Sequence, residues 1–248
     1  MARLVLFVNG ELGIRAVEFL AGQVVGAVVH PPGERDSERI RNAVGDDIPI
    51  WKSDQLEKEQ TRSEMEGLRP THGLSVLYGD SIPASILDLF PEGAANLHPS
   101  LLPHGRGAHP HAWAIAAKEP AGVTLHLIDG GLNTGPILAQ EAVHTLGTDT
   151  AAALYARLID TATQLLASSI PLWLQGRLQA RPQPKSPSAP RQAGDLDREL
   201  RIDPDKSYSG RELIDILRAR TFPPYPGAPY DQDGARLRVR IELAEEDD

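Results

Sequence analysis

The run Leu4-Val5-Leu6-Phe7-Val8-Asn9-Gly10 is continuously apolar until it ends in a turn pair. An amphipathic stretch follows from Ile14 to Leu20, and a second apolar run, Val24 to Val29, closes with Pro31-Pro32. An apolar run, a glycine turn, a helix and another apolar run describe a βαβ unit, whose parallel strands are buried on both faces. The chain is therefore predicted to be an α/β protein.

Further segments extend this pattern. A helix is predicted over 53–68 with Ser53 as its N-cap, and Pro83 is predicted to open a short helix. Thr150 caps a long helical stripe of apolar residues. The expected strands are the apolar runs 48–50, 74–77, 94–97 and 123–128. Together these elements favour a Rossmann-like, mostly parallel sheet with flanking helices.

The C-terminal part differs in composition. Residues 181–194 are rich in Pro, Ser and Gln, which is typical of a linker. Beyond it, 209–217 predicts a helix, and Asp233-Gly234 predicts a hairpin turn before a half-buried strand of alternating apolar residues that runs to Leu243. The expected organisation is a catalytic domain at 1–180, a linker at 181–194 and a small helix and β-hairpin subdomain at 195–248.

Composition excludes several classes of function. The 248 residues carry 25 basic and 34 acidic side chains, a net charge of −9, and no cysteine. A disulfide framework, a thiolate zinc site and a cysteine nucleophile are therefore excluded, and the negative field disfavours nucleic acid as a partner. No run approaches the ~18 apolar residues of a membrane span, and the N-terminus lacks a signal-peptide layout, so a cytoplasmic protein is expected.

The segment that carries chemistry is Asn96-Leu97-His98-Pro99-Ser100-Leu101-Leu102-Pro103-His104-Gly105-Arg106-Gly107. Asn96 and His98 stand two apart at a strand end, so both project to one side at the sheet edge where open α/β folds bind ligands. A carboxamide donates a hydrogen bond to a developing oxyanion, and an imidazole donates a proton near neutral pH. This pair suits acyl transfer; the alternative is a pair of capping and loop-stabilising side chains.

Three motifs together resemble the formyltransferases that use 10-formyltetrahydrofolate, which include methionyl-tRNA, glycinamide ribonucleotide and nucleotide-sugar amine enzymes. The motifs are Asn96 to Pro103, Gly122-Val123-Thr124-Leu125-His126, and Gly131-Leu132-Asn133-Thr134-Gly135-Pro136-Ile137. The resemblance spans roughly residues 3 to 180. The later segment 217–227, which ends in Phe222-Pro223-Pro224-Tyr225-Pro226-Gly227, also resembles the tRNA and sugar members.

The resemblance implies that a neutral amine attacks the formyl carbon and that N10 of the folate leaves. Asn96 and His98 would stabilise the oxyanion. The folate pocket would be lined by Tyr78, Gly79, Asp80, Ser81 and Ile82, and closed on its other side by the loop from Asp129. Substrate contacts are expected at Gly10, His104, Arg106 and His109. The alternative for Gly10 is a simple tight turn, and the alternative for the histidines is a position at a helix N-terminus. No metal site is expected, since suitable cysteines and a third carboxylate are lacking.

Position 133 departs from the resemblance. The family's third catalytic group is an aspartate there, whereas this sequence has Asn133, which offers the same shape without the charge. Three interpretations stay open: Asp129, His126 or water carries the proton; the acceptor nitrogen is unusually reactive; or the protein binds folate without catalysis. If the missing carboxylate limits turnover, Asn133→Asp should raise formyl transfer.

The expected acceptor is the amine of a small molecule, and the sugar members of the family favour a nucleotide-linked amino sugar. An amine on a peptide or antibiotic intermediate is equally compatible. Methionyl-tRNA members carry a further C-terminal barrel, whereas only about 60 residues follow the linker here. Methionyl-tRNA or another amine remains the alternative acceptor, and a degenerate folate-binding protein the alternative class. Because an isolated hairpin must pack on something, a homodimer is expected.

Overall fold

The computed structural model describes residues 2–30, 34–186 and 188–243. The chain forms two compact units, each assembled from three separate segments. Unit 1 contains Met1–His98, Thr124–Gln140 and Ala162–Gln183, and unit 2 contains Pro99–Val123, Glu141–Thr161 and Pro184–Asp248. Strands β6 (Ala121–Leu127) and β7 (Ile137–Val143) and helix α6 (Ala151–Leu174) each run through a boundary between the two.

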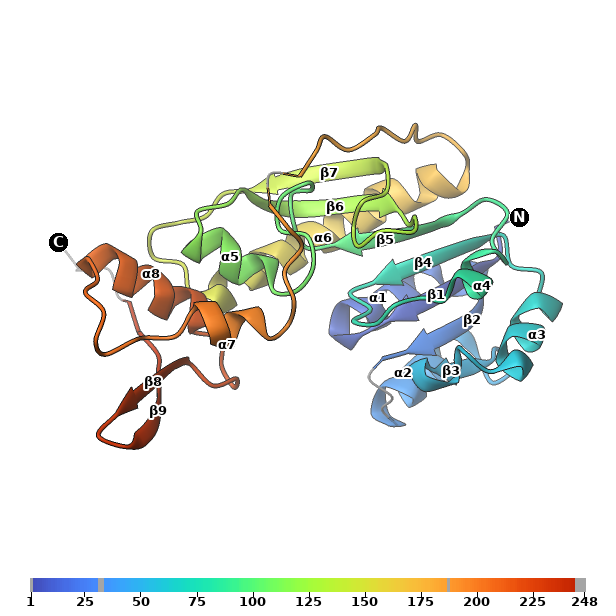
Figure 1. The fold of residues 1–248 in the computed structure, drawn as a ribbon. Helices are drawn as coiled ribbons and strands as arrows, with labels where there is room; N and C mark the ends of the chain where they lie inside the picture. The colour runs from blue at the N-terminus through green and yellow to red at the C-terminus, as the bar shows by residue number, and fades with distance from the viewer. Residues whose placement is uncertain (1, 31–33, 187, 244–248) are drawn as a thin grey trace. The chain divides into compact units, whose positions relative to one another are not determined.

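A seven-stranded sheet carries the architecture, in the order β3-β2-β1-β4-β5-β6-β7 (Figure 1). Its first five strands in sequence are β1 (Leu4–Val8), β2 (Val24–Val29), β3 (Ile50–Lys52), β4 (His72–Val76) and β5 (Ala94–His98). All neighbours among these five are parallel, whereas β6 runs antiparallel to β5. The predicted α/β class with a mostly parallel sheet is confirmed.

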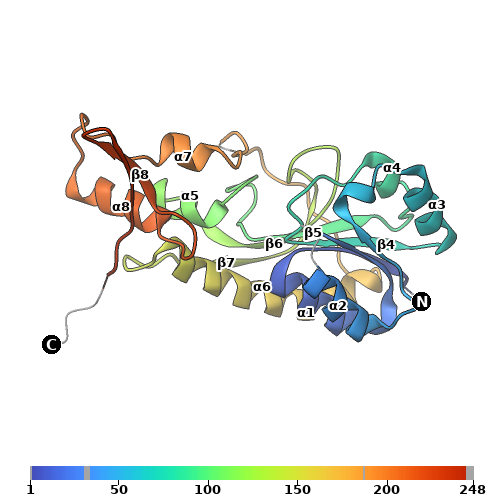
Figure 2. The same cartoon turned by 90° about the horizontal axis from the view of Figure 1, so that it is seen from below.

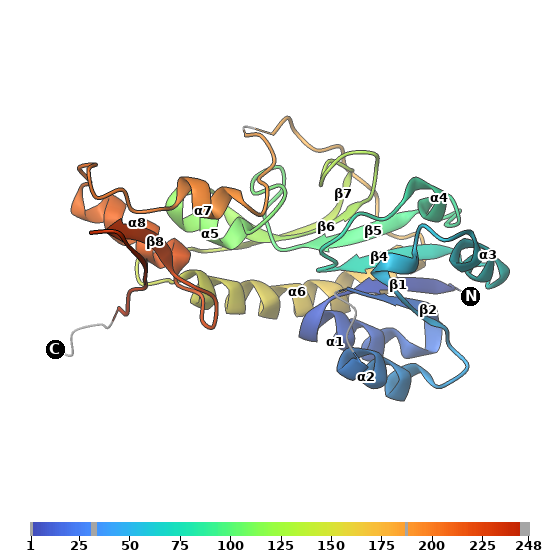
Figure 3. The same cartoon turned by 60° about the horizontal axis from the view of Figure 1, so that its bottom comes forward.

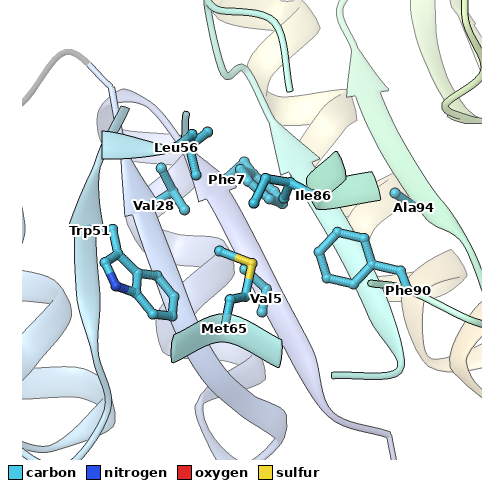
Figure 4. Close-up of a cluster of buried hydrophobic side chains, with 9 residues drawn as sticks. All are labelled: Val5, Phe7, Val28, Trp51, Leu56, Met65, Ile86, Phe90 and Ala94. Atoms are coloured by element: carbon cyan, nitrogen blue, oxygen red, sulfur yellow. The ribbon is translucent and has the colours of Figure 1, made fainter. Parts of the chain in front are cut away.

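Helices cover both faces of the sheet in unit 1. Helices α1 (Gly10–Leu20) and α2 (Glu34–Val44) lie on one face, and α3 (Glu59–Gly67) and α4 (Ala84–Leu87) on the other (Figures 2 and 3). The face under α3 and α4 is packed by nine buried side chains, drawn in Figure 4: Val5, Phe7, Val28, Trp51, Leu56, Met65, Ile86, Phe90 and Ala94. Burial on both faces explains why these strands are continuously apolar.

The single helix predicted over 53–68 is wrong, because the chain forms a 3₁₀ turn at Ser53–Gln55 and begins α3 only at Glu59. The Ser53 hydroxyl does not cap a helix; its Oγ lies 3.0 Å from Nδ1 of His30. The Gln55 side chain turns back instead and accepts a hydrogen bond from the Lys52 backbone N–H at 2.7 Å. Local side-chain bonds of this kind compete with helix propagation.

Unit 2 contains the helices α5 (Pro110–Ala116), α7 (Asp195–Glu199) and α8 (Gly210–Arg220). Helix α8 packs against α5. The helix predicted over 209–217 is present as α8, and Ser209 is its N-cap: its hydroxyl accepts a hydrogen bond from Glu212 N–H, and the Glu212 carboxylate accepts one from Ser209 N–H. Within the described residues, no helix of the chain is long and apolar enough to cross a membrane.

The predicted C-terminal hairpin is present as β8 (Ala228–Gln232) and β9 (Ala235–Val239). Asp233 and Gly234 both have positive φ, as a two-residue hairpin turn of this type requires. The expectation of a half-buried strand is wrong for residues 235–238, which are exposed; Leu237 is 46% exposed. Leu237 and its neighbours on β9 therefore remain open to solvent in the described part of the chain.

The segment predicted as a linker is hydrogen-bonded at both ends. In unit 1, Arg181 exchanges two backbone hydrogen bonds with Ile137, at 2.7 and 2.8 Å. In unit 2, Arg191 N–H donates to the Arg106 carbonyl at 2.9 Å. Residue 187 of this segment, and residues 244–248 of the predicted C-terminal subdomain, lie outside the described residues.

An ion pair in unit 2 between the buried Asp149 and the partly exposed Arg157 gives a prediction about stability. The side chain of Asp149 is 3% exposed and accepts two hydrogen bonds from Arg157 and one from Leu146 N–H, each at 2.6 Å. Burial raises the pKa of Asp149, but these bonds outweigh burial and hold the pKa below its ordinary value of 3.8. We expect Asp149→Asn to lower the free energy of unfolding by about 2 kcal/mol at neutral pH, because strong hydrogen bonds to a charged, buried carboxylate are replaced by weaker bonds to a neutral amide.

The matched control is Glu59→Gln, which removes an exposed partner of Arg62 and should cost less than about 1 kcal/mol. Because the folded pKa of Asp149 is depressed, its contribution is present above the unfolded pKa and is lost as pH falls through the folded pKa. Urea unfolding from about pH 6 down to pH 2 measures both effects. Equal losses in the two variants, or a difference that persists at the lowest pH, would contradict the assignment.

Candidate active site

The predicted catalytic pair lies on the last strand of the parallel series. Asn96 and His98 alternate with the buried Ala95 and Leu97 on β5, so their side chains share one face of the sheet. His98 is itself 9% exposed. Antiparallel pairing places His126 of β6 directly opposite Asn96, and Thr124 opposite His98. The carboxyl end of β5 therefore presents polar groups from both strands.

Three side chains of unit 1 meet at one nitrogen atom, and we call them the amide–imidazole cluster: Asn96, His126 and Asn133. Nε2 of His126 lies 3.2 Å from Nδ2 of Asn96 and 3.4 Å from Nδ2 of Asn133. Nδ1 of His126 lies 2.7 Å from the Leu127 carbonyl oxygen. The structure thus brings together two of the predicted catalytic residues through His126, which the sequence offered only as one alternative proton carrier.

The loop that carries Asn133 is held from within. One carboxylate oxygen of Asp129 accepts hydrogen bonds from Gly131 N–H at 2.9 Å and from the Thr134 hydroxyl at 2.5 Å. The Gln183 amide donates to the Asn133 carbonyl at 3.1 Å and to the Gly135 carbonyl at 2.6 Å. Asn133 itself has a φ of +54°, a left-handed conformation that asparagine tolerates better than most residues. These contacts fix where the Asn133 amide stands.

Gly135 gives a prediction for this loop, because a Cβ there would lie 1.9 Å from the Leu127 carbonyl oxygen. We expect Gly135→Ala to push the loop away from β6, to lower the free energy of unfolding by about 2 kcal/mol or more, and to displace Asn133. Gly130→Ala is the matched control, since a Cβ at that position meets nothing within 4 Å. Thermal unfolding and formyl-transfer rates compare the two. Indistinguishable variants would show that the loop does not depend on this close approach.

The segment predicted to line the folate pocket follows β4. The Tyr78 ring makes edge contacts with Phe7 and His30, and burial raises the pKa of its hydroxyl. Asp80 accepts a hydrogen bond from Ser81 N–H at 2.9 Å. Gly79 lies against the His30 imidazole, where an added Cβ would come within 3.3 Å of the ring. Ile82 packs on the core below α4.

Gly10 stands at the start of α1, directly after β1, with a φ of +59° and open space where a Cβ would be. The neighbouring acid, Glu11, is not an isolated negative charge. Hydrogen bonds from Arg39 at 2.6 Å and from Arg15 at 3.2 Å lower its pKa to about 2. The charge of Glu11 is therefore balanced locally.

The three other predicted substrate contacts belong to unit 2. His104 donates its backbone N–H to the Leu101 carbonyl at 3.0 Å. Arg106 donates through Nη2 to the Ser188 carbonyl at 3.4 Å, while its buried Nε has no hydrogen-bond partner in the described part of the chain. His109 caps α5 in a left-handed conformation, and burial together with the charge of Arg220 lowers its pKa.

A second group of side chains, outside the predicted site residues, is a row of rings in unit 2. The His111 ring lies 5.0 Å from that of Tyr155 and 5.4 Å from that of Phe222, and the Phe222 ring lies 5.6 Å from that of Tyr225. Burial lowers the pKa of His111 to about 3, so the ring is neutral. Among the described residues, no three histidine or acidic side chains are arranged to hold a metal ion.

Residues 22–170 match the model of the formyl transferase family, and residues 195–245 match the N-formyltransferase dimerization C-terminal domain. The chain belongs to the formyl transferase family. This match confirms the family that the motif Asn96–Pro103 and the two later motifs predicted. The family's activity is formyl transfer, and solved structures that share the fold contain tetrahydrofolate or a formylated tetrahydrofolate.

Individual formyl transferases resemble the chain to different extents. A methionyl-tRNA formyltransferase of Myxococcus xanthus is 31% identical over 198 residues, which cover 77% of this chain and 60% of that protein. A 4-N formyltransferase from Francisella tularensis shares the fold with a TM-score of 0.83 at 22% identity, over 99% of each chain. An N-formyltransferase from Helicobacter canadensis, solved with folinic acid and dTDP-3-aminofucose, has a TM-score of 0.73 at 19% identity, over 95% of this chain and 86% of that one.

Proposed function

We propose that this formyl transferase moves the formyl group of 10-formyltetrahydrofolate to the amine of a small molecule, a nucleotide-linked amino sugar. The match of residues 195–245 to the N-formyltransferase dimerization domain carries this proposal. The fold shared with an enzyme solved together with a nucleotide-linked amino sugar supports it. The net charge of −9 weighs against tRNA, because phosphate binding depends on clustered basic groups.

The site chemistry fits a reaction in which negative charge develops on an oxygen. The folate supplies an electrophilic formyl carbon when it is bound. Asn96 offers N–H donors, and His98 offers a ring nitrogen two residues further along the same face of β5. Donors that are fixed before the reaction stabilise developing charge without reorganising, which is the largest single contribution in many acyl transfers.

The acceptor is proposed to contact unit 2 through Arg106, with His104 and His109 beside it in sequence. The buried Nε of Arg106 has no partner in the described residues, and a guanidinium with an unused donor suits a phosphate group, which accepts paired hydrogen bonds. Gly10, in open space at the N-terminus of α1, is a second candidate contact for an anionic group.

A homodimer is proposed to cover the exposed hairpin. Residues 195–245, which include β8 and β9, match a dimerization domain. Leu237 is 46% exposed on this ribbon, and a two-stranded ribbon is marginally stable by itself. Burial against a second copy would remove this apolar surface from water.

The test mixes the purified protein with 10-formyltetrahydrofolate and a panel of nucleotide-linked amino sugars, with charged methionyl-tRNA as a further acceptor. Tetrahydrofolate release and a formylated sugar are expected together. Product only with methionyl-tRNA would replace the proposed acceptor. Tight folate binding with no product from any acceptor would support a degenerate folate-binding protein.

A further inference from the structure

The hydrogen-bond partners of His126 determine where its proton lies. The Leu127 carbonyl oxygen, 2.7 Å from Nδ1, can only accept, so Nδ1 carries the hydrogen. The two carboxamide nitrogens that approach Nε2, those of Asn96 and Asn133, can only donate, so Nε2 carries the lone pair. His126 is therefore the neutral Nδ1–H tautomer.

The surroundings of His126 favour this neutral form. The residue is 2% exposed, and burial lowers its pKa; the hydrogen bond to Leu127 and the negative charge of Asp129 oppose the shift without cancelling it. Two titratable groups lie on the elements beside His126: His98, two residues from Asn96 on the same face of β5, and Asp129 in the loop after β6. At neutral pH the acceptor at Nε2 is consequently intact.

The neutral ring also sets the orientation of both amides. A carboxamide is planar, so fixing one N–H of Asn96 on Nε2 fixes the direction of its second N–H and of its oxygen. The Asn133 amide is fixed at the same nitrogen from the loop side, 3.4 Å away. Distances of 3.2 and 3.4 Å are long for such bonds, as expected when two donors share a single lone pair.

We propose that His126 is a positioning residue that holds the amides of Asn96 and Asn133 through its unprotonated Nε2. Asn133 suits this neutral imidazole because its amide can donate a hydrogen bond to Nε2. The catalytic consequence rests on the proposed function, because it requires Asn96 to donate to the formyl oxygen. A carboxylate at position 133 has no hydrogen to donate. It draws a proton onto Nε2, and the protonated nitrogen no longer accepts a hydrogen bond from Asn96.

This proposal reverses the expectation that Asn133→Asp raises activity. In the His126 background, the substitution is expected to lower kcat on the order of tenfold or more, since Asn96 loses its acceptor and moves. In the His126→Gln background it should cost much less, because a glutamine amide accepts from Asn96 through its oxygen and donates to the introduced aspartate through its nitrogen. His144→Gln, a change at an exposed histidine, is the matched control.

The first test needs no acceptor and no turnover. In the NMR spectrum of protein labelled with ¹⁵N-histidine, the Nε2 resonance of His126 should be that of an unprotonated nitrogen at pH 7, with Nδ1 protonated. The His126→Gln variant identifies this resonance, because the signal is missing from its spectrum. Asn133→Asp should move Nε2 to the protonated form at the same pH, and Asn133→Ala should leave it unprotonated. A protonated Nε2 in the unmodified protein, or an unchanged Nε2 in Asn133→Asp, would overturn the proposal.

The second test measures kcat and KM for both substrates in the four combinations of His126→Gln and Asn133→Asp. The expected signature is a kcat loss from Asn133→Asp that is at least several-fold smaller when His126→Gln is present, with the KM for folate nearly constant. Two outcomes would contradict the proposal that Asn133 suits the neutral imidazole of His126. One is an identical loss of kcat in both backgrounds, and the other is a gain of kcat in the His126 background. Absence of turnover in every protein, with the resonances as expected, would count against the proposed function alone.

Discussion

Replacement of His98 by alanine is expected to lower kcat for formyl transfer by about a thousandfold, because general acid–base and oxyanion-stabilising groups contribute on this scale. His98 ends β5, is 9% exposed, and shares its face of the sheet with Asn96. In the proposed mechanism, its removal takes away a donor at the reacting oxygen without adding a charge. The effect should fall on the chemical step, so KM for the folate should change little.

The matched control for His98→Ala is His144→Ala, which changes an exposed histidine and should leave kcat near its original value. Binding of a non-reactive folate analogue, measured by calorimetry, separates loss of chemistry from loss of binding. An unchanged kcat in His98→Ala would remove this residue from the mechanism. A loss accompanied by an equal loss of analogue binding would assign it to the folate pocket instead.

Asn96→Asp is expected to be at least as damaging, and more damaging than Asn96→Ala. In the proposed mechanism alanine removes one oxyanion donor, a change that costs about 10² to 10³ in kcat in comparable sites. Aspartate adds a negative charge where negative charge must develop, and it also approaches Nε2 of His126 with an acceptor instead of a donor. The two unfavourable effects act on the same step.

Single-turnover rates of the two Asn96 variants, measured with saturating folate, test this order. Thermal unfolding provides the control, because Asn96 is half-buried and Asn96→Ala should destabilise the fold only modestly. An aspartate variant that is faster than the alanine variant would show that a carboxylate serves the reaction at this position, which would contradict the role given to the amide.

Much of the fold was predictable because unit 1 is built from strands buried on both faces. Continuous apolar runs such as Leu4–Val8 and Val24–Val29 predict the strands of a parallel sheet, and both runs are strands in the structure. The region 53–68 was mispredicted because Ser53 and Gln55 form local bonds that break one helix into two elements. The burial of the strand after Gly234 was mispredicted. Alternation of apolar and polar residues indicates a strand, but it does not show whether another element packs on the apolar face.

The candidate site was predictable only in part. Asn96 and His98 follow from their spacing on one strand, because that spacing places them on one face. His126 could not be placed in the same way, since it meets Asn96 only through the antiparallel pairing of β5 with β6, and no motif encodes that register. The role of Asp129 within its own loop likewise depends on contacts with Gly131 and Thr134 that form only when the loop folds.

The central claim is that Asn96 and His98 act together on one oxygen of the transferred group, and a double-mutant cycle in single-turnover formyl transfer tests it most directly. Residues that act as a unit are strongly non-additive. The account predicts that Asn96→Ala combined with His98→Ala is little slower than the slower single variant. Losses that multiply in full, or a double variant that retains the rate of the unmodified protein, would contradict it.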